Sequence, residues 1–242
     1  IMLSSPIFLD YQSSTPCHSE VVDSMKPYWD KTFGNPSSKS NLAGISSSAA
    51  LEVSREKIIK KLNIKNQKII FTSGATEANN LALLGYARNF HKRTGSFGNI
   101  ITLKTEHHAV LEPIRQLEKE GFTFTEISPM ENGLIDQEIF LKAIKKDTFL
   151  VSIMLANNEI GVVQPIQNIA QICKSKQIIL HTDAAQCVGY LPLNLISTNA
   201  NMITLSSHKI YGPKGVGLLI IDNDINLEPL FFGGGQEFGF RS

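Results

Sequence analysis

The stretches QIILHTDAAQ at 177–186 and NMITLSSHKIYGPKG at 201–215 decide the fold class. Each opens with a short β-rich run and ends in polar, chemically active residues. Further β-rich runs of this kind lie at 68–72, 99–104, 122–127, 149–155 and 216–221. Several of the runs are continuous rather than alternating in hydrophobicity, which is typical of strands buried on both faces.

Segments with helical periodicity separate these runs, at 49–62, 77–90, 110–120, 137–145 and 166–174. Alternating strands and helices with long crossovers predict an α/β fold, a mostly parallel sheet covered by helices. The first 48 residues differ, because they hold one possible helix at 19–31 and the loop GNPSS at 34–38. We expect this segment to form an arm rather than a unit of the sheet.

Composition excludes several classes of protein. The 242 residues carry 23 basic and 22 acidic side chains, which argues against a strongly basic nucleic-acid binder and against an acidic disordered tail. No apolar run approaches the roughly 18 residues that cross a bilayer, and no signal-peptide pattern opens the chain. The cysteines at 17, 173 and 187 fit neither a disulfide framework nor a metal cluster. We expect a cytoplasmic enzyme without metal or membrane association.

Ligands of open α/β sheets bind beyond the carboxyl ends of the strands. The run at 68–72 is followed by SGATEANN, in which Gly74 and Ala75 allow a tight turn. Thr76 is placed to cap the next helix with its hydroxyl, and the first amides of that helix could bind an anion. An ordinary strand-to-helix turn with a threonine cap is the alternative interpretation.

Polar residues follow three other expected strands. His107 comes after 99–104, and Asn157 and Asn158 come after 149–155. Hydrogen bonding within the local structure is the alternative to ligand binding at these positions. Asp183 ends the strand at 177–183, with Gln186 one turn onward. A carboxylate buried there requires a cationic partner or several donors.

The loop after 201–206 offers Ser206, His208 and Lys209. A lysine held in a partly desolvated loop has a lowered pKa and becomes a carbonyl nucleophile. Lys214 stands in a Pro-Lys-Gly setting, which we interpret as a solvated turn. A phosphate cradle, a ring, an acid, an amide and a lysine together match what pyridoxal phosphate requires of a protein.

Several blocks resemble the cysteine desulfurases of the NifS/IscS type, of the fold-type-I pyridoxal-phosphate class. They are FTSGATEANN, TEHHAV, MLANNEIGVVQPI, HTDAAQCVG, SSHKIYGPKGVG and GGGQE, with the arm sequences FLDYQSSTP and FGNPSS. The resemblance extends from residue 7 to 242. It implies an N-terminal arm at 1–48, a cofactor-binding large domain at 49–222, and at 223–242 the start of a connection towards a C-terminal small domain that is absent from this chain.

The resemblance also implies a role for each site residue. Lys209 would hold the cofactor covalently and later move the Cα proton. Asp183 would pair with the pyridine nitrogen, and His107 would stack on the ring and could assist proton transfer. Asn158 and Gln186 would bind on the side of the phenolic oxygen. The residues implied in phosphate binding are Ala75, Thr76, Ser206 and His208.

The implied reaction converts L-cysteine to L-alanine, with the sulfur leaving as a persulfide on a reactive cysteine. Sulfur would pass to iron–sulfur scaffold or tRNA-thiolation proteins, and the enzyme would be a homodimer. A selenocysteine lyase, a fold-related aminotransferase and a truncated, non-catalytic cofactor-binding or dimerising protein are the alternatives.

The chain departs from the family's pattern at several points. Phe238 stands where an arginine usually follows GGGQE, and Ser207 replaces a common glycine. The family's sulfur-accepting cysteine and its carboxylate-binding arginine belong to the small domain. We expect Cys17, Cys173 and Cys187 to be small apolar fillers instead.

Overall fold

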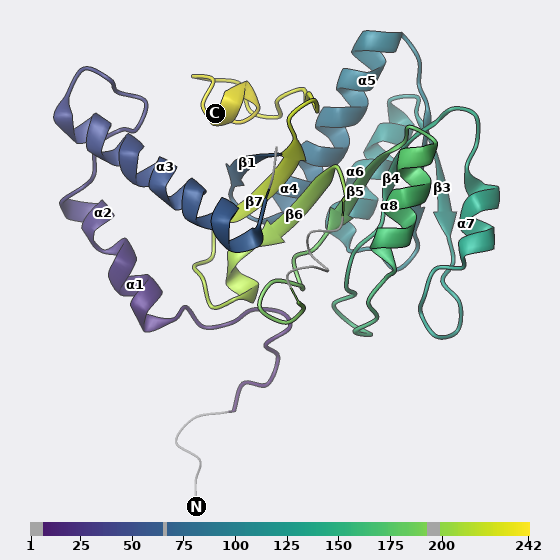
Figure 1. Ribbon diagram of the computed structural model, residues 1–242, viewed down its shortest axis with the longest axis horizontal. Coiled ribbons are helices and arrows are strands. Elements are labelled where there is room, and N and C mark those ends of the chain that lie inside the picture. Colours follow the sequence, from purple (N-terminus) through teal and green to yellow (C-terminus); the bar gives the residue numbers. More distant parts are fainter. Residues whose placement is uncertain (1–6, 65–66, 193–198) are drawn as a thin grey trace, which may run out of the picture.

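The computed structural model describes residues 7–64, 67–192 and 199–242 and is drawn in Figure 1. At its centre lies a seven-stranded sheet of order β1-β7-β6-β5-β4-β2-β3. The strands are β1 (Gln67–Thr72), β2 (Asn99–Leu103), β3 (Thr123–Ile127), β4 (Thr148–Ser152), β5 (Ile179–Asp183), β6 (Met202–Ser206) and β7 (Gly217–Asp222). β7 is antiparallel to β1 and β6, and the other neighbouring strands pair in parallel. The expectation of a mostly parallel sheet is confirmed.

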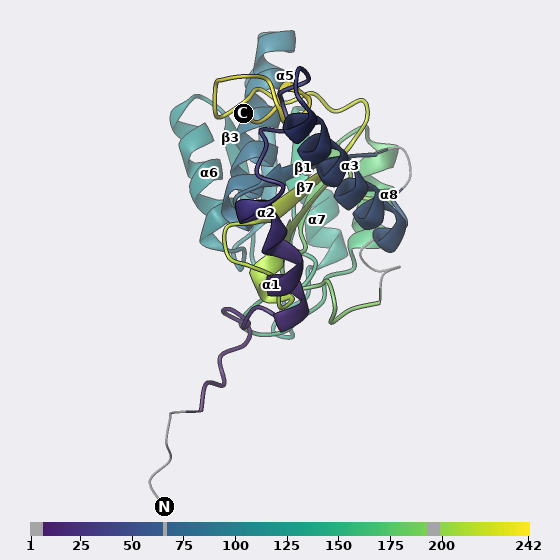
Figure 2. The ribbon, with the colours of Figure 1, turned by 90° about the vertical axis from the view of Figure 1, so that its left-hand side faces the viewer.

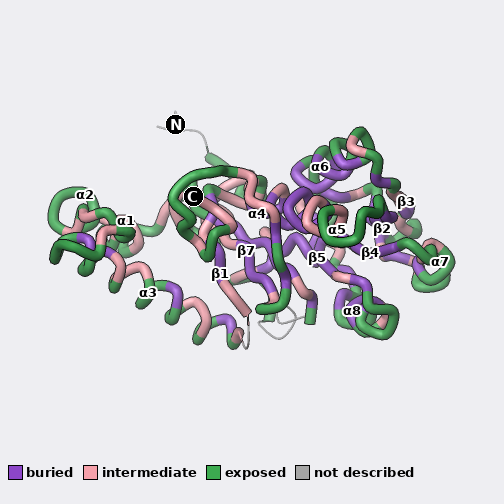
Figure 3. The backbone as a smooth tube through the Cα atoms, turned by 90° about the horizontal axis from the view of Figure 1, so that it is seen from above, coloured by how far each residue is buried: buried purple, intermediate pink, exposed green. Residues whose placement is uncertain are grey.

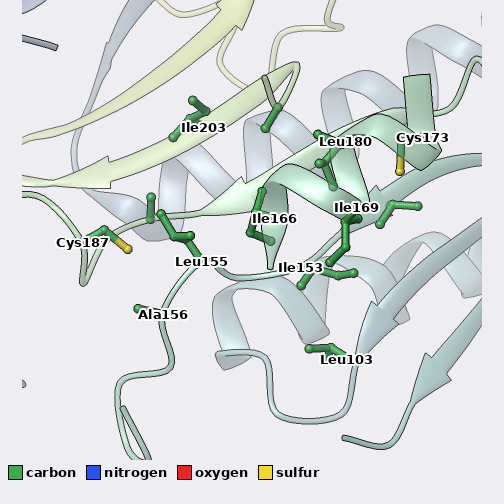
Figure 4. Packing of buried hydrophobic residues seen from close by; sticks show 14 of the residues in the cluster. Leu103, Ile153, Leu155, Ala156, Ile166, Ile169, Cys173, Leu180, Cys187 and Ile203 are labelled. Carbon is green, nitrogen blue, oxygen red and sulfur yellow. The ribbon is translucent and has the colours of Figure 1, made fainter. Parts of the chain in front are cut away.

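Helices cover both faces of the sheet. On one face lie α4 (Ala75–Asn80), a π-helical turn (Leu81–Gly85), α5 (Tyr86–Thr94) and α6 (His108–Lys119), and their side chains pack on Ile100 and Leu150. On the other face lie α7 (Gln137–Ala143) and α8 (Ile166–Ser175), which pack on Leu180. Figure 3 shows the buried strands between these layers, and Figure 4 shows α8 against β5.

The arm contains α1 (Ser19–Met25), α2 (Pro27–Asp30) and the start of α3 (Leu42–Leu62), and these helices lie in front of the β1 edge in Figure 2. The single helix expected at 19–31 is wrong, because Pro27 begins a new helix after Lys26. The helix expected at 49–62 begins at Leu42, where the Asn41 side chain accepts a hydrogen bond from the Gly44 N–H. α3 therefore crosses residue 48, and the division into three segments stays a prediction.

Three other elements differ from expectation. The helix expected at 77–90 begins at Ala75 and ends at Thr94, where Gly95 takes a φ of 70°. The strand expected at 149–155 leaves the sheet after Ser152, although the next residues still donate hydrogen bonds to the main chain of 181 and 183. The strand expected at 177–183 starts at Ile179. The remaining expected elements lie within about two residues of the observed ones.

The sheet directions place one set of strand ends together. Because β7 reverses the direction between β6 and β1, β1 runs the same way as the parallel strands. The loops that follow β1, β2, β4, β5 and β6 therefore meet at one edge of the sheet. None of the helices in the described part of the chain has the length and apolar character needed to span a membrane.

Candidate functional site

A cavity of about 630 Å³ lies at this edge of the sheet. Its walls come from the arm, from the loops after β1, β2, β4 and β5, and from the turn after β6. Of the nine residues proposed from the sequence, all but Ser206 line it: Ala75, Thr76, His107, Asn158, Asp183, Gln186, His208 and Lys209. The topology has brought together residues that are up to 134 positions apart (209 minus 75).

Lys209 ends a 3-10 turn (Ser207–Lys209) that follows β6 directly. Its Nζ donates hydrogen bonds to the main-chain oxygens of Gln12 at 2.7 Å and Ser13 at 2.9 Å. Burial lowers the pKa of Lys209, while the carboxylates of Asp183 and Asp10 oppose that shift. This is the direction expected from the sequence, and it increases the fraction of free amine at neutral pH.

Asp183 lies at the carboxyl end of β5 with 6% of its surface exposed. Its Oδ2 accepts a hydrogen bond from Asn79 Nδ2 at 2.7 Å, and its Oδ1 accepts one from the Ala185 N–H at 2.9 Å. Burial raises the pKa of Asp183, and these donors, with the charges of His107 and Lys209, pull it down. The buried carboxylate therefore has the donors that its position requires.

His107 caps α6, and its Nδ1 accepts a hydrogen bond from the Ala109 N–H at 3.0 Å. Because Nδ1 accepts this hydrogen bond, the ring hydrogen is carried on Nε2. The side chain also lines the cavity, so the local hydrogen bond and the exposure to a ligand coexist. The cap fixes the direction of the ring.

The expectation that Thr76 caps the helix after β1 is wrong. The cap position is Gly74, whose φ is 154°, and it makes no side-chain hydrogen bond. Glu77 instead binds the chain just before the helix: its Oε2 accepts a hydrogen bond from the Ser73 N–H at 2.7 Å. Arg241 Nε donates to its Oε1 at 2.8 Å. Thr76 is exposed and faces the cavity with its hydroxyl free of that task.

The two asparagines after β4 have separate tasks. Asn157 is buried and satisfies its own loop, since its Oδ1 accepts from the N–H groups of Glu159 and Ile160. Asn158 lines the cavity. Gln186 also lines the cavity, and its Nε2 donates to the Gln12 oxygen at 2.9 Å. The local-bonding alternative therefore holds for the first asparagine.

Ser206 precedes the turn that carries the lysine, and His208 lies within it. The Ser206 Oγ is buried and has no hydrogen-bond partner within the described residues. His208 Nδ1 lies 3.4 Å from Ser14 Oγ. Burial lowers the pKa of His208, and the charges of Lys209 and Lys214 lower it further. Lys214, which we had assigned to a solvated turn, is exposed but stands on the cavity rim.

Several residues at the site were not predicted from the sequence. Gln12, Ser13 and Ser14 of the arm line the cavity, and only the FLDYQSSTP block pointed towards them. Asn79 and Glu106 hydrogen-bond to Asp183 and to the Met154 N–H, and only the FTSGATEANN and TEHHAV blocks contained them. Their tasks depend on neighbours that are distant in sequence.

Glu106 joins two loops of the site. Its Oε1 accepts a hydrogen bond from the Met154 N–H at 2.7 Å, while its Oε2 is buried without a partner in the described chain. Burial raises the pKa of Glu106 well above its ordinary value of 4.5, and the neighbouring Asp183 charge raises it further. At pH values between its ordinary pKa and the raised one, the folded protein thus holds a proton on Glu106 that the unfolded chain has released.

In the wild type we expect the free energy of unfolding to fall as the pH rises above 4.5, and we expect Glu106→Gln to reduce this fall. While the folded protein keeps the Glu106 proton and the unfolded chain has lost it, each pH unit above 4.5 lowers the free energy of unfolding by up to ~1.4 kcal/mol. The amide of glutamine does not titrate, so the variant lacks this contribution. The free energy of unfolding is measured across the acidic-to-neutral range in both proteins. Glu138→Gln, which changes an exposed carboxylate, serves as the control. A wild-type-minus-variant difference that does not change with pH means that Glu106 is ionised in the fold.

Cys173 and Cys187 are poor nucleophiles. Burial raises the pKa of Cys173 to about 12, and burial together with Asp183 does the same for Cys187. Figure 4 shows both thiols among apolar side chains. Cys17 is partly exposed and faces a neighbouring cavity rather than this one.

Comparison with known proteins places these features in a family. Residues 7–240 match the family described as aminotransferase class-V. The chain is 46% identical over 242 residues to the cysteine desulfurase IscS of Neisseria meningitidis, covering 99% of this chain and 59% of that protein. It is 46% identical over 239 residues to a probable mitochondrial cysteine desulfurase of Dictyostelium discoideum, covering 98% and 52%. The chain thus spans about half to three-fifths of these relatives' length.

Solved structures give the same picture. A NifS-like protein superposes with a TM-score of 0.92 at 37% identity, covering 98% of this chain and 64% of that one. A structure described as SspA in complex with cysteine superposes with a TM-score of 0.89 at 38% identity, covering 97% and 67%. The sheet, its helices and the site loops are therefore arranged as in known NifS-like folds.

Proposed function

Because the chain belongs to the class-V aminotransferase family, we propose that it is the pyridoxal-phosphate-binding part of a cysteine desulfurase. The observation that carries the proposal is the convergence of Lys209, Asp183 and His107 on one cavity. In the full-length protein these residues would serve the conversion of L-cysteine to L-alanine. Relatives named as cysteine desulfurases support the reaction.

The residues present fit the cofactor. The exposed hydroxyl of Thr76 lines the cavity and would donate to a phosphate beside the first amides of α4 at Ala75. The Oγ of Ser206 is buried and unpartnered within the described residues but does not line the cavity, so its contact with the phosphate rests on the family resemblance. His208 completes this side of the cavity. The remaining walls carry the carboxylate of Asp183, the ring of His107 and the amine of Lys209. Each chemical group of the cofactor therefore has a counterpart.

Asp183 would hold a proton on the pyridine nitrogen, and the Asn79 donor keeps its carboxylate directed. His107 would lie on the ring face, because its Nδ1 is fixed by the Ala109 N–H. Asn158 and Gln186 would bind on the phenolic-oxygen side. When bound, pyridoxal phosphate supplies an electron sink for a carbanion at the substrate Cα.

Lys209 would attach the cofactor through Nζ and then move the Cα proton. Burial favours its neutral amine, which can do both. On binding the cofactor, Nζ would exchange its hydrogen bonds to Gln12 and Ser13 for the covalent bond. His107 lines the same cavity and would assist the proton transfer.

We further propose that sulfur leaves on a cysteine outside these 242 residues. Cys173 and Cys187 are buried with raised pKa values, and Cys17 does not line the cavity. A C-terminal small domain, reached through 223–242 from the large domain at 49–222, would supply this cysteine and the arginine for the substrate carboxylate. Iron–sulfur scaffold or tRNA-thiolation proteins would accept the sulfur.

A homodimer is the proposed assembly. The arm at 1–48 and the start of α3 expose large apolar side chains, which a second copy could cover. Those with at least two-thirds of their surface exposed are Ile7, Leu9, Trp29, Phe33 and Leu42. A cytoplasmic location is proposed, and the mitochondrial relative makes an organelle the alternative.

Turnover of L-cysteine by the full-length protein tests the proposal. We expect alanine as the product, and Asp183→Asn should lower kcat by about 10²–10³-fold, the loss typical of removing one preorganised electrostatic partner. Asp222→Asn is the matched control, because Asp222 ends β7 at the opposite edge of the sheet.

Parallel assays separate the alternatives. L-selenocysteine as the preferred substrate would indicate a lyase of that class, and alanine formation that requires a keto acid would indicate an aminotransferase. A full-length protein that binds the cofactor and turns over none of these would contradict the proposal.

A further inference from the structure

The turn that carries Lys209 is held from outside by the arm, which passes beside it in Figures 1 and 2. Thr15 is 6% exposed, and both its N–H and its hydroxyl donate to the His208 oxygen, at 2.8 and 2.9 Å. The same hydroxyl accepts from the Tyr211 N–H at 2.7 Å. Thr15 thus binds main-chain groups on both sides of Lys209.

The held conformation is one that the turn would not adopt alone. Tyr211 has a φ of 61°, in the left-handed region that disfavours a bulky L-residue. Within the turn, the N–H groups of Ile210 and Gly212 both donate to the Ser207 oxygen at 3.0 Å, while the Tyr211 N–H points to Thr15. Strain of this kind persists only where the surroundings impose it.

A second contact supports the same segment. The His18 N–H donates to the Tyr211 oxygen at 2.9 Å, so the arm binds Tyr211 at both its N–H and its oxygen. Thr15 itself faces a neighbouring cavity of about 700 Å³ and does not line the candidate site. Any effect that it has on the site must therefore be indirect, through the main chain of the turn or through the adjoining Ser13 and Ser14, which contact Lys209 and His208.

We propose that Thr15 is a positioning residue for Lys209, whose hydroxyl holds the main chain at 208–211 so that the amine enters the cavity. The binding of pyridoxal phosphate by this amine rests on the proposed function, whereas the effect of Thr15 on the conformation of the turn does not. Thr15→Val keeps the size and the main-chain N–H but removes the hydroxyl. Thr15→Ser keeps both hydrogen bonds of the hydroxyl and is the matched control.

Hydrogen exchange of the full-length, cofactor-free protein tests the turn. We expect amides at 207–212 to exchange about tenfold faster in Thr15→Val, because the Tyr211 N–H loses its partner, and to stay near the wild-type rate in Thr15→Ser. The double variant Thr15→Val with Tyr211→Gly should have a higher free energy of unfolding than Thr15→Val alone, because glycine adopts a positive φ without strain. This variant keeps the test available if the valine variant folds poorly.

The rate at which pyridoxal phosphate attaches covalently tests whether the Lys209 amine is correctly positioned. The rate is followed over a range of pH by borohydride reduction and mass spectrometry of the Lys209 peptide. Thr15→Val should attach the cofactor about tenfold more slowly with a displaced pH profile, while Thr15→Ser should stay within about threefold of the wild type.

The proposal is overturned by wild-type exchange and attachment in Thr15→Val, or by equal defects in the valine and serine variants. A lower melting temperature with an unchanged pH profile and unchanged exchange at 207–212 also overturns it, since Thr15 would then only stabilise the fold. If the wild type attaches no cofactor at Lys209, the proposed function fails instead, and the exchange data still decide the role of Thr15.

Discussion

Lys209→Ala is expected to abolish covalent attachment of pyridoxal phosphate and all turnover of L-cysteine. Lys209 reaches the cavity from a turn directly after β6, and burial favours its neutral amine. Asp183 and His107 would still bind the cofactor without a covalent bond. Attachment is measured as borohydride-stable mass on the full-length protein, and turnover as alanine formed from L-cysteine.

Lys214→Ala is the control for this prediction. Lys214 stands on the rim of the same cavity but is exposed, and it lowers the pKa of His208 from a distance. We expect its variant to keep the covalent mass on the Lys209 peptide. Borohydride-stable cofactor on the Lys209→Ala protein would show that a different amine is used and would contradict the assignment.

Glu237→Ala is expected to lower the free energy of unfolding by about 3–5 kcal/mol, the usual cost of leaving a buried charge without its partner. The side chains of Arg55 and Glu237 are 8% and 10% exposed, and Arg55 Nη2 lies 3.1 Å from Glu237 Oε1. The Phe71 N–H also donates to Glu237 Oε2 at 2.8 Å. The variant removes the buried carboxylate from Arg55, which among the described residues keeps only its hydrogen bonds to the Ile69 oxygen and to the exposed Glu52, and it leaves this amide without its acceptor.

Aromatic rings deepen the burial of this pair. The Arg55 guanidinium lies 4.9 Å from the centroid of the Phe71 ring and 5.1 Å from that of Phe238. Phe238, the departure from the usual arginine after GGGQE, thus packs on the buried cation. Because Arg55 is 7% exposed, its guanidinium recovers little solvation when the carboxylate is removed.

Glu52→Ala is the matched control for Glu237→Ala. Glu52 Oε1 lies 3.3 Å from Arg55 Nε, but its side chain is 59% exposed, so its loss should cost no more than about 1 kcal/mol. Both variants are compared with the wild type by urea unfolding. Equal losses in the two variants would mean that burial does not strengthen the dependence on Glu237.

The fold was largely predictable because its signals are local. Continuous apolar runs identified the strands, and the residues that follow them, such as His107 and Asp183, were placed on one edge by parallel topology alone. The errors were local too. The serine-rich start of α3 lacks apolar periodicity, and Thr76 resembles a cap as closely as Glu77 does.

The sequence by itself determined the α/β architecture, the family and the residues that line most of the site, because strand hydrophobicity and strand-end chemistry are encoded within a few neighbouring residues. Only the tertiary structure decided how those residues are held: Asn79 on Asp183, Glu106 on Met154, and Thr15 on the turn of Lys209. These hydrogen bonds join segments from 48 to 196 residues apart. Their energy depends on burial and direction, which exist only once the chain has folded.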